Sequence, residues 1–111
     1  MDRREAIRNY KERVQPMGIF CIRNQRNGKA FLGSSLDVPA MLNRLRFQLQ
    51  LGKHPNVALQ TDWTHLGADA FTLETLDLLK ASVEPDYDPK DDLQTLLEMW
   101  RETMRANGEL Y

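Results

Sequence analysis

The sequence predicts an α+β domain in which a small three-stranded antiparallel sheet is flanked by helices. Two short apolar runs enclose the polar stretch NQRNGK, which indicates a β-hairpin. A later run, AFTLETLDLL, alternates apolar and polar residues and supplies the third strand. Other segments repeat apolar residues every three to four positions, as amphipathic helices do. Strands and helices in this order are typical of an α+β fold.

The first two elements are an added N-terminal helix and the hairpin. Residues 1–16 should contain a helix that ends before the first proline, because apolar residues recur there at helical spacing. The hairpin strands should span residues 18–24 and 29–34, with the turn at Asn27-Gly28. Both strands are apolar at consecutive positions, so we expect both faces of the sheet to be covered.

The remaining elements follow from caps and periodicity. A helix should begin after Asp37, a good N-cap, and end at Gly52. A shorter helix should run from about Pro55 to Leu66. The last helix should open on Asp88-Pro89, an N-cap and N1 pair. The expected units are one domain over residues 1–111, with an N-terminal helix at 1–16, a motif core at 18–79 and a C-terminal helix at 88–107.

The composition is that of a soluble globular domain. The chain has 111 residues, of which 41% are hydrophobic and 28% charged. No apolar run approaches the roughly 18 residues that a membrane span needs, and the charged N-terminus does not resemble a secretory signal. Cys21 is the only cysteine and is expected to be a buried small hydrophobe rather than a catalytic thiol. These features predict a cytoplasmic protein without membrane contact.

Charge is divided unevenly along the chain. Residues 1–53 hold 11 lysines and arginines against 4 acidic residues, whereas residues 54–111 hold 4 against 12. The two parts therefore carry net charges of +7 and −8. This asymmetry is compatible with a basic face for nucleic acid. It is also compatible with two halves that neutralise each other across one compact domain, which the absence of any dense lysine and arginine cluster favours.

Two stretches, GIFCIRNQRNGKAFLGSS and GKHPNVALQTDWTHLGADAFTLETL, resemble the GIY-YIG nuclease family. The family pattern is G-I-Y, an N-x-x-N-G-K turn, Y-I-G-S, a helix with R-x-x-x-H, and then G-x-H-x-N. The resemblance covers residues 18–79. It implies a three-stranded sheet with flanking helices that cuts nucleic-acid phosphodiesters. In the family, two tyrosines, the helix arginine and a glutamate that holds one divalent metal carry out this reaction.

This chain departs from the family pattern wherever the family chemistry needs a polar group. The matched positions are all apolar: Phe20 and Phe31 for the tyrosines, Met41 for the arginine, Leu45 for the histidine, and Leu97 for the metal-binding glutamate when the last helix is aligned on Trp100. The resemblance therefore implies no catalytic residues, no metal ligand and no cofactor. A single Mg or Mn ion is expected only if activity is retained through displaced groups, with Arg44 or Arg46 in place of Met41 and Glu98 in place of Leu97.

Three functional hypotheses remain open. The first is a catalytically inactive domain whose apolar former site binds a protein partner, a small ligand or a second copy of the chain, unless that face has closed into the core. The second is a DNA- or RNA-binding protein. The third is an endonuclease with relocated catalytic groups. His54 is expected to be a cap or surface residue rather than a metal ligand. The candidate nucleic-acid contacts are Arg23, Arg26, Lys29, Arg44, Arg46, Lys53, His54 and Asn56.

Overall fold

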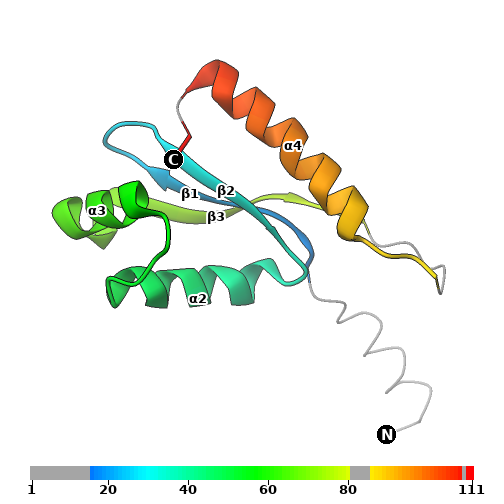
Figure 1. Cartoon of the computed structure of the whole chain (residues 1–111), viewed down its shortest axis with the longest axis horizontal. Coiled ribbons are helices and arrows are strands. Elements are labelled where there is room, and N and C mark those ends of the chain that lie inside the picture. The colour runs from blue at the N-terminus through cyan, green and yellow to red at the C-terminus, as the bar shows by residue number, and fades with distance from the viewer. Residues whose placement is uncertain (1–15, 81–85, 109) are drawn as a thin grey trace, which may run out of the picture.

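A computed structural model describes residues 16–80, 86–108 and 110–111. The helix expected before Pro16 lies outside the described residues, and the single domain over 1–111 stays a prediction. Helices pack on both faces of a small sheet (Figure 1). The elements are β1 (Gly18–Asn24), β2 (Ala30–Ser35), α2 (Val38–Gln50), α3 (Val57–Leu66), the short 3-10 helix η1 (Ala68–Ala70), β3 (Phe71–Leu78) and α4 (Lys90–Asn107).

The sheet has three strands in the order β2-β1-β3, and both pairings are antiparallel. The α+β prediction is therefore confirmed. β1 is the central strand, and Ile22 lies between Phe31 on one side and Leu73 on the other. A bulge between Ile19 and Phe20 shifts the register with β3. The apolar sequence of β1 suits a strand that is paired at both edges and covered on both faces.

Side chains of asparagine and the freedom of one glycine set the hairpin turn. Asn24 Oδ1 accepts a hydrogen bond from the Arg26 N–H, and Asn27 Oδ1 accepts one from the Lys29 N–H, both at 2.9 Å. Gly28 has a φ of +78°, a left-handed conformation that favours glycine. Because the Lys29 N–H is used inside the turn, β2 begins at Ala30, one residue later than the sequence predicts.

The two sheet faces carry separate apolar clusters. Phe20 and Ile22 pack with residues of α2 and α3, including Leu45 and Leu49. Successive residues of a strand point to opposite faces, so Ile19 and Cys21 pack on the other side, under α4. Both faces are covered, as the consecutive apolar positions of the hairpin predict.

The N-termini of α2 and α3 are capped by side chains. Asp37 Oδ1 accepts a hydrogen bond of 3.2 Å from the Ala40 N–H, which confirms Asp37 as the N-cap of α2. Asn56 Oδ1 accepts one of 3.0 Å from the Leu59 N–H. Because Asn56 is the cap, α3 begins at Val57, later than the start near Pro55 that the sequence suggests.

α4 begins at Lys90, after the Asp88-Pro89 pair. Asp88 Oδ1 accepts a hydrogen bond of 3.0 Å from the Lys90 N–H, so the expected acidic residue does contact the helix start, although the N-cap is Pro89 and the helix itself begins one residue later than predicted. Trp100 Nε1 donates a 2.9 Å hydrogen bond to Asp77 Oδ2 and so ties α4 to β3. No helix in the described part of the chain is long and apolar enough to cross a membrane.

Candidate functional site

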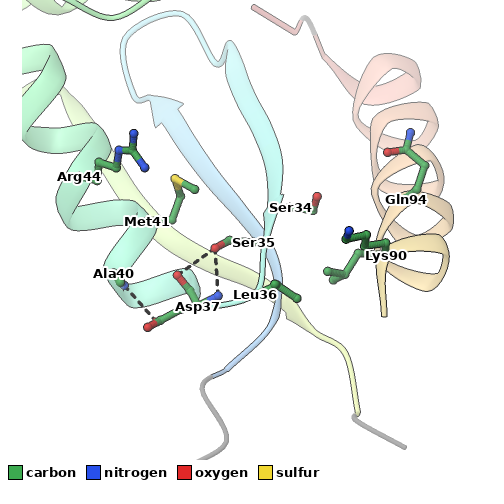
Figure 2. A pocket seen from close by; sticks show the side chains of 10 residues that line it. Ser34, Ser35, Leu36, Asp37, Ala40, Met41, Arg44, Lys90 and Gln94 are labelled. Atoms are coloured by element: carbon green, nitrogen blue, oxygen red, sulfur yellow. Dashed lines mark hydrogen bonds between the residues drawn. The ribbon is translucent and has the colours of Figure 1, made fainter. Parts of the chain in front are cut away.

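A cavity of about 620 Å³ lies between α2 and α4, over the end of β2 (Figure 2). One wall is the first two turns of α2, the other is the first turn of α4, and the end of β2 with the following loop lies between them. The lining residues are Ser34, Ser35, Leu36, Asp37, Ala40, Met41, Arg44, Lys90, Leu93 and Gln94.

The acidic side chain of the cavity is already committed to holding the start of α2. Asp37 caps the helix through the Ala40 N–H. Ser35 Oγ accepts a 3.0 Å hydrogen bond from the Asp37 N–H and donates one of 2.9 Å to the Asp37 carbonyl oxygen. These bonds, visible in Figure 2, fix the loop that joins β2 to α2. The carboxylate of Asp37 is therefore already engaged by the Ala40 N–H at the start of α2.

Two cations stand on opposite walls of the cavity, Arg44 on α2 and Lys90 on α4. Neither side chain forms an ion pair with any other described residue. Asp37 is the only acidic lining residue, and Ser34 and Gln94 add a hydroxyl and an amide. Guanidinium, ammonium, hydroxyl and amide groups around one cavity can hold an anion such as a phosphate.

The apolar positions that match the family chemistry belong largely to the core. Phe20 is 4% exposed and Leu45 is 7% exposed, whereas Phe31 and Met41 are half-buried and pack against the same cluster. The rings of Phe20 and Phe31 lie 6.2 Å apart between centroids. A Cβ added to Gly33 would overlap the Phe20 ring, so the ring fills the space above this glycine. The predicted apolar binding face therefore keeps only Phe31 and Met41 as partly open positions.

The five matched positions do not form one apolar face, because Leu97 lies apart from the other four. This residue is 6% exposed and packs in the cluster under α4 with Ile19, Cys21 and Leu32. That cluster lies on the other face of the sheet from Phe20, because neighbouring residues of a strand point in opposite directions. Within the same cluster, burial raises the pKa of the Cys21 thiol and keeps the thiol neutral, in agreement with its predicted role as a core residue.

His54 is buried rather than exposed. Its Nδ1 accepts a 3.0 Å hydrogen bond from the Asn56 N–H, and its ring lies edge-on to Phe31 with centroids 5.1 Å apart. Burial lowers the pKa of His54, so the neutral imidazole is favoured. Of the two expected roles, a cap or a surface residue, the surface role is therefore wrong, because the ring is buried against Phe31. With Asn56 capping α3, both residues hold the fold together and are poorly placed to contact nucleic acid.

The cations of the hairpin lie apart from the cavity. Arg23 Nε is 3.9 Å from Glu74 Oε1, and Lys29 Nζ lies 5.8 Å from the Tyr111 ring centroid. Arg26 is exposed in the turn. The turn precedes β2 and the cavity follows it, so the two groups of cations lie at opposite ends of this strand. The hairpin cations do not join those of the cavity in one patch.

The second group of predicted cations lies on α2 and just after its C-terminal end. Arg44, Arg46 and Lys53 are all exposed, and residues 38–53 contain no aspartate or glutamate. The surface of α2 is therefore cationic without acidic residues of its own. α4, by contrast, has Asp91 and Asp92 in its first turn and further acidic residues along its length.

The described residues contain no cluster of three or more histidine, cysteine, aspartate or glutamate side chains that could hold a metal ion. Glu98, the nearest carboxylate to the matched glutamate position, accepts hydrogen bonds of 3.0 Å from Gln94 Nε2 and 3.4 Å from Arg101 Nη1. Glu98 does not line the cavity, although Gln94 does. Hard divalent cations such as the one used by the family prefer several carboxylate oxygens as ligands. Among the described residues, the cavity offers only the carboxylate of Asp37, which already caps α2, so its lining does not suit such a cation.

No protein-family model and no curated protein matches this sequence. Two solved structures do resemble it. The catalytic domain of the homing endonuclease I-TevI is 25% identical, with a TM-score of 0.67 over 85% of this chain and 96% of that one. A glutamate-to-alanine mutant of the catalytic domain of the intron endonuclease I-TevI is 24% identical, with a TM-score of 0.68 over 86% and 92% of the two chains. This chain has the GIY-YIG fold.

Within the GIY-YIG fold, the cavity adjoins the position of the family arginine. Met41 lines it, and Arg44, three residues further along α2, supplies a guanidinium from the next turn of the same helix. The sequence pointed to Arg44 through this spacing. It gave no signal for Ser34, Lys90 or Gln94, because α4 and the end of β2 are brought together only by the packing of the sheet.

Proposed function

We propose that this GIY-YIG-like domain binds nucleic acid through the phosphate backbone and does not cleave it. The contact surface is the cavity between α2 and α4, together with the exposed side of α2. The observation that carries this proposal is that Arg44 and Lys90 line one cavity from two different helices, and that α2 has cations and no acidic residues.

The absence of cleavage follows from the residue types at the matched positions. One general acid or base typically contributes about 10²–10⁴-fold to a rate. Phe20 and Phe31 have no proton to exchange, and Met41 cannot neutralise a developing charge on phosphate. Phe20 and Leu45 are also packed in the core, so a substrate would not reach them. These losses together leave little phosphodiesterase activity.

Phosphate binding follows from charge and access. Arg44 and Arg46 are exposed on α2, and Lys90 of α4 lines the same cavity as Arg44. Each lysine or arginine that neutralises a phosphate releases counterions, which makes such binding strong at low salt and weak at high salt. The solved relatives are described as endonuclease catalytic domains, which supports a nucleic-acid ligand for this fold.

Binding should be measured by fluorescence anisotropy with labelled single-stranded and duplex oligonucleotides at several salt concentrations. Replacement of both cavity cations, Arg44→Ala with Lys90→Ala, should weaken binding at least tenfold at low salt. The slope of log K against log salt should become shallower by about one to two, as about one phosphate contact is lost per residue. Arg105→Ala, an exposed cation near the other end of α4, is the matched control and should leave binding unchanged.

A nicking assay on plasmid DNA with Mg²⁺ or Mn²⁺ tests the catalytic part of the proposal. We expect no cleavage. Nicking that Arg44→Ala abolishes would instead support an endonuclease with relocated groups. No binding to any oligonucleotide at low salt would overturn the proposal, and a dimer in sedimentation or apolar-dye binding by the folded protein would then favour an interface at Phe31 and Met41.

A further inference from the structure

α2 carries an exposed aromatic ring directly opposite its buried side. Phe47 is 62% exposed, whereas Leu45 and Leu49, two positions before and after it, are buried in the core. At about 100° per residue, positions two apart lie on nearly opposite sides of a helix. Leu51, one turn further on, is 54% exposed. The helix therefore presents a small apolar ridge to solvent.

Among the exposed large hydrophobic residues in the described part of the chain, Phe47 is the one with an aromatic ring. Those away from α2, such as Val57 and Leu78, need no explanation as single surface residues. A phenylalanine on the outer face of a helix loses the free energy of burial, so its place on this helix points to a bound state that covers the ring.

The charged residues near Phe47 indicate the charge of a ligand that would cover the ring. Arg44 lies one turn before Phe47, and Arg46 lies on the other flank of the exposed face, about 100° from the ring. Lys53 follows the C-terminal end of the helix, and no acidic residue occurs from 38 to 53. A second copy of α2 would bring these cations against one another without compensating carboxylates, which is unfavourable. A polyanion matches this surface.

We propose that the exposed face of α2 binds single-stranded nucleic acid, with Phe47 as a platform on which an unpaired base stacks. This inference rests on the proposed function and specifies its ligand. In a duplex the bases are already stacked on one another, so a protruding ring gains contact only with an unpaired base. Arg44 belongs both to the cavity wall and to the turn before Phe47, so a phosphate held in the cavity lies next to the stacked base.

The test compares oligo-dT with a dA·dT duplex of equal length, both with a fluorescent label, in anisotropy titrations of the full chain. Wild-type protein should prefer the single strand. Phe47→Ala should weaken single-strand binding about tenfold and change duplex binding little, with an unchanged salt slope. Phe47→Trp should restore single-strand binding, since it keeps a stacking surface. Val57→Ala, at an exposed apolar residue of α3, is the matched control and should have no effect.

The outcomes separate the two proposals. If Phe47→Ala leaves single-strand binding unchanged while Arg44→Ala weakens it, the stacking platform is overturned and phosphate binding stands. If neither oligonucleotide binds, both proposals fall. A wild-type dimer that Phe47→Ala converts to a monomer would assign this face to a second copy instead. Because Phe47 is exposed, circular dichroism should show that the variant is folded.

Discussion

The hydroxyl of Tyr111 donates a 2.6 Å hydrogen bond to Asp62 Oδ2, 49 residues earlier in the chain. The same hydroxyl accepts a 2.8 Å hydrogen bond from Asn24 Nδ2, and Asn24 is fully buried at the end of β1. The Tyr111 N–H also donates to the Ala30 carbonyl oxygen at 2.9 Å. One side chain thus connects the hairpin, α3 and the segment after α4.

Tyr111→Phe should lower the free energy of unfolding by about 1–2 kcal/mol, because the buried Asn24 amide loses its 2.8 Å partner and keeps only a 3.4 Å hydrogen bond to Asp62 Oδ2. Urea denaturation measures this change. The matched control is Tyr87→Phe, whose hydroxyl donates a 2.7 Å hydrogen bond to Asp92 at an exposed site, and little change is expected there. Equal losses in the two variants would contradict the structural role of Tyr111.

Acid should remove part of the stability that the Asp62 carboxylate gives to the folded state. The hydrogen bond from the Tyr111 hydroxyl is the main cause that lowers the pKa of Asp62 below its usual value of 3.8. A carboxylate with a depressed pKa stabilises the folded state at pH values above the unfolded pKa, and this contribution is lost as the pH falls through the folded pKa. The stability gap between wild type and Asp62→Asn should therefore shrink below about pH 4. A gap that stays constant down to pH 2 would contradict the prediction.

His54 should make the fold sensitive to mild acid. Because burial lowers the pKa of His54 below 6.5, the unfolded chain binds a proton more readily than the folded one. The free energy of unfolding should then decrease as the pH falls from about 6.5 towards the folded pKa. Melting temperatures between pH 7.5 and 5 test this in wild type, His54→Gln and the exposed control His65→Gln. The decrease of melting temperature with falling pH should become smaller only in His54→Gln. An equal decrease in all three proteins would refute the role of the buried His54 in this pH dependence.

Restoring the two family tyrosines should have unequal effects on stability. Phe20→Tyr places a hydroxyl in a buried site where the ring already fills the space above Gly33, so a loss of about 1–3 kcal/mol is expected. Phe31→Tyr should be tolerated, because that residue is half-buried. Urea denaturation of the two single variants makes the comparison. A stable Phe20→Tyr protein would show that the core beside Gly33 is looser than the structure indicates.

Restoring the family glutamate should fail for a related reason. Leu97→Glu would bury a carboxylate among Ile19, Cys21 and Leu32, at a cost of several kcal/mol, and should prevent stable folding. Gln94→Glu, one turn earlier and exposed beside the cavity, should fold normally. Circular dichroism and thermal melts distinguish them. A folded Leu97→Glu variant that gains stability from Mn²⁺ would overturn the placement of Leu97 on the far face of the sheet.

Most of the fold could be predicted because its signals are local. The Asn27-Gly28 turn, the Asp37 cap and the apolar periodicity of α2 depend on neighbours within a few residues, and the structure keeps all three. Errors of one or two residues occur at element ends, where a side chain such as that of Asn56 decides which N–H it caps. The short 3-10 helix η1 gave no signal in the sequence.

The sequence by itself determined the fold and the apolar residue types at the positions matched to the family pattern, since both depend on residues at fixed spacings. Only the tertiary structure decided which of these positions meet. It packed Phe20 and Leu45 into the core, placed Leu97 on the opposite face, and brought Lys90 to the cavity of Arg44. Side chains alternate between the two faces of a sheet along a strand, and a bulge can shift that alternation. How closely two helices approach depends in turn on how their whole surfaces pack.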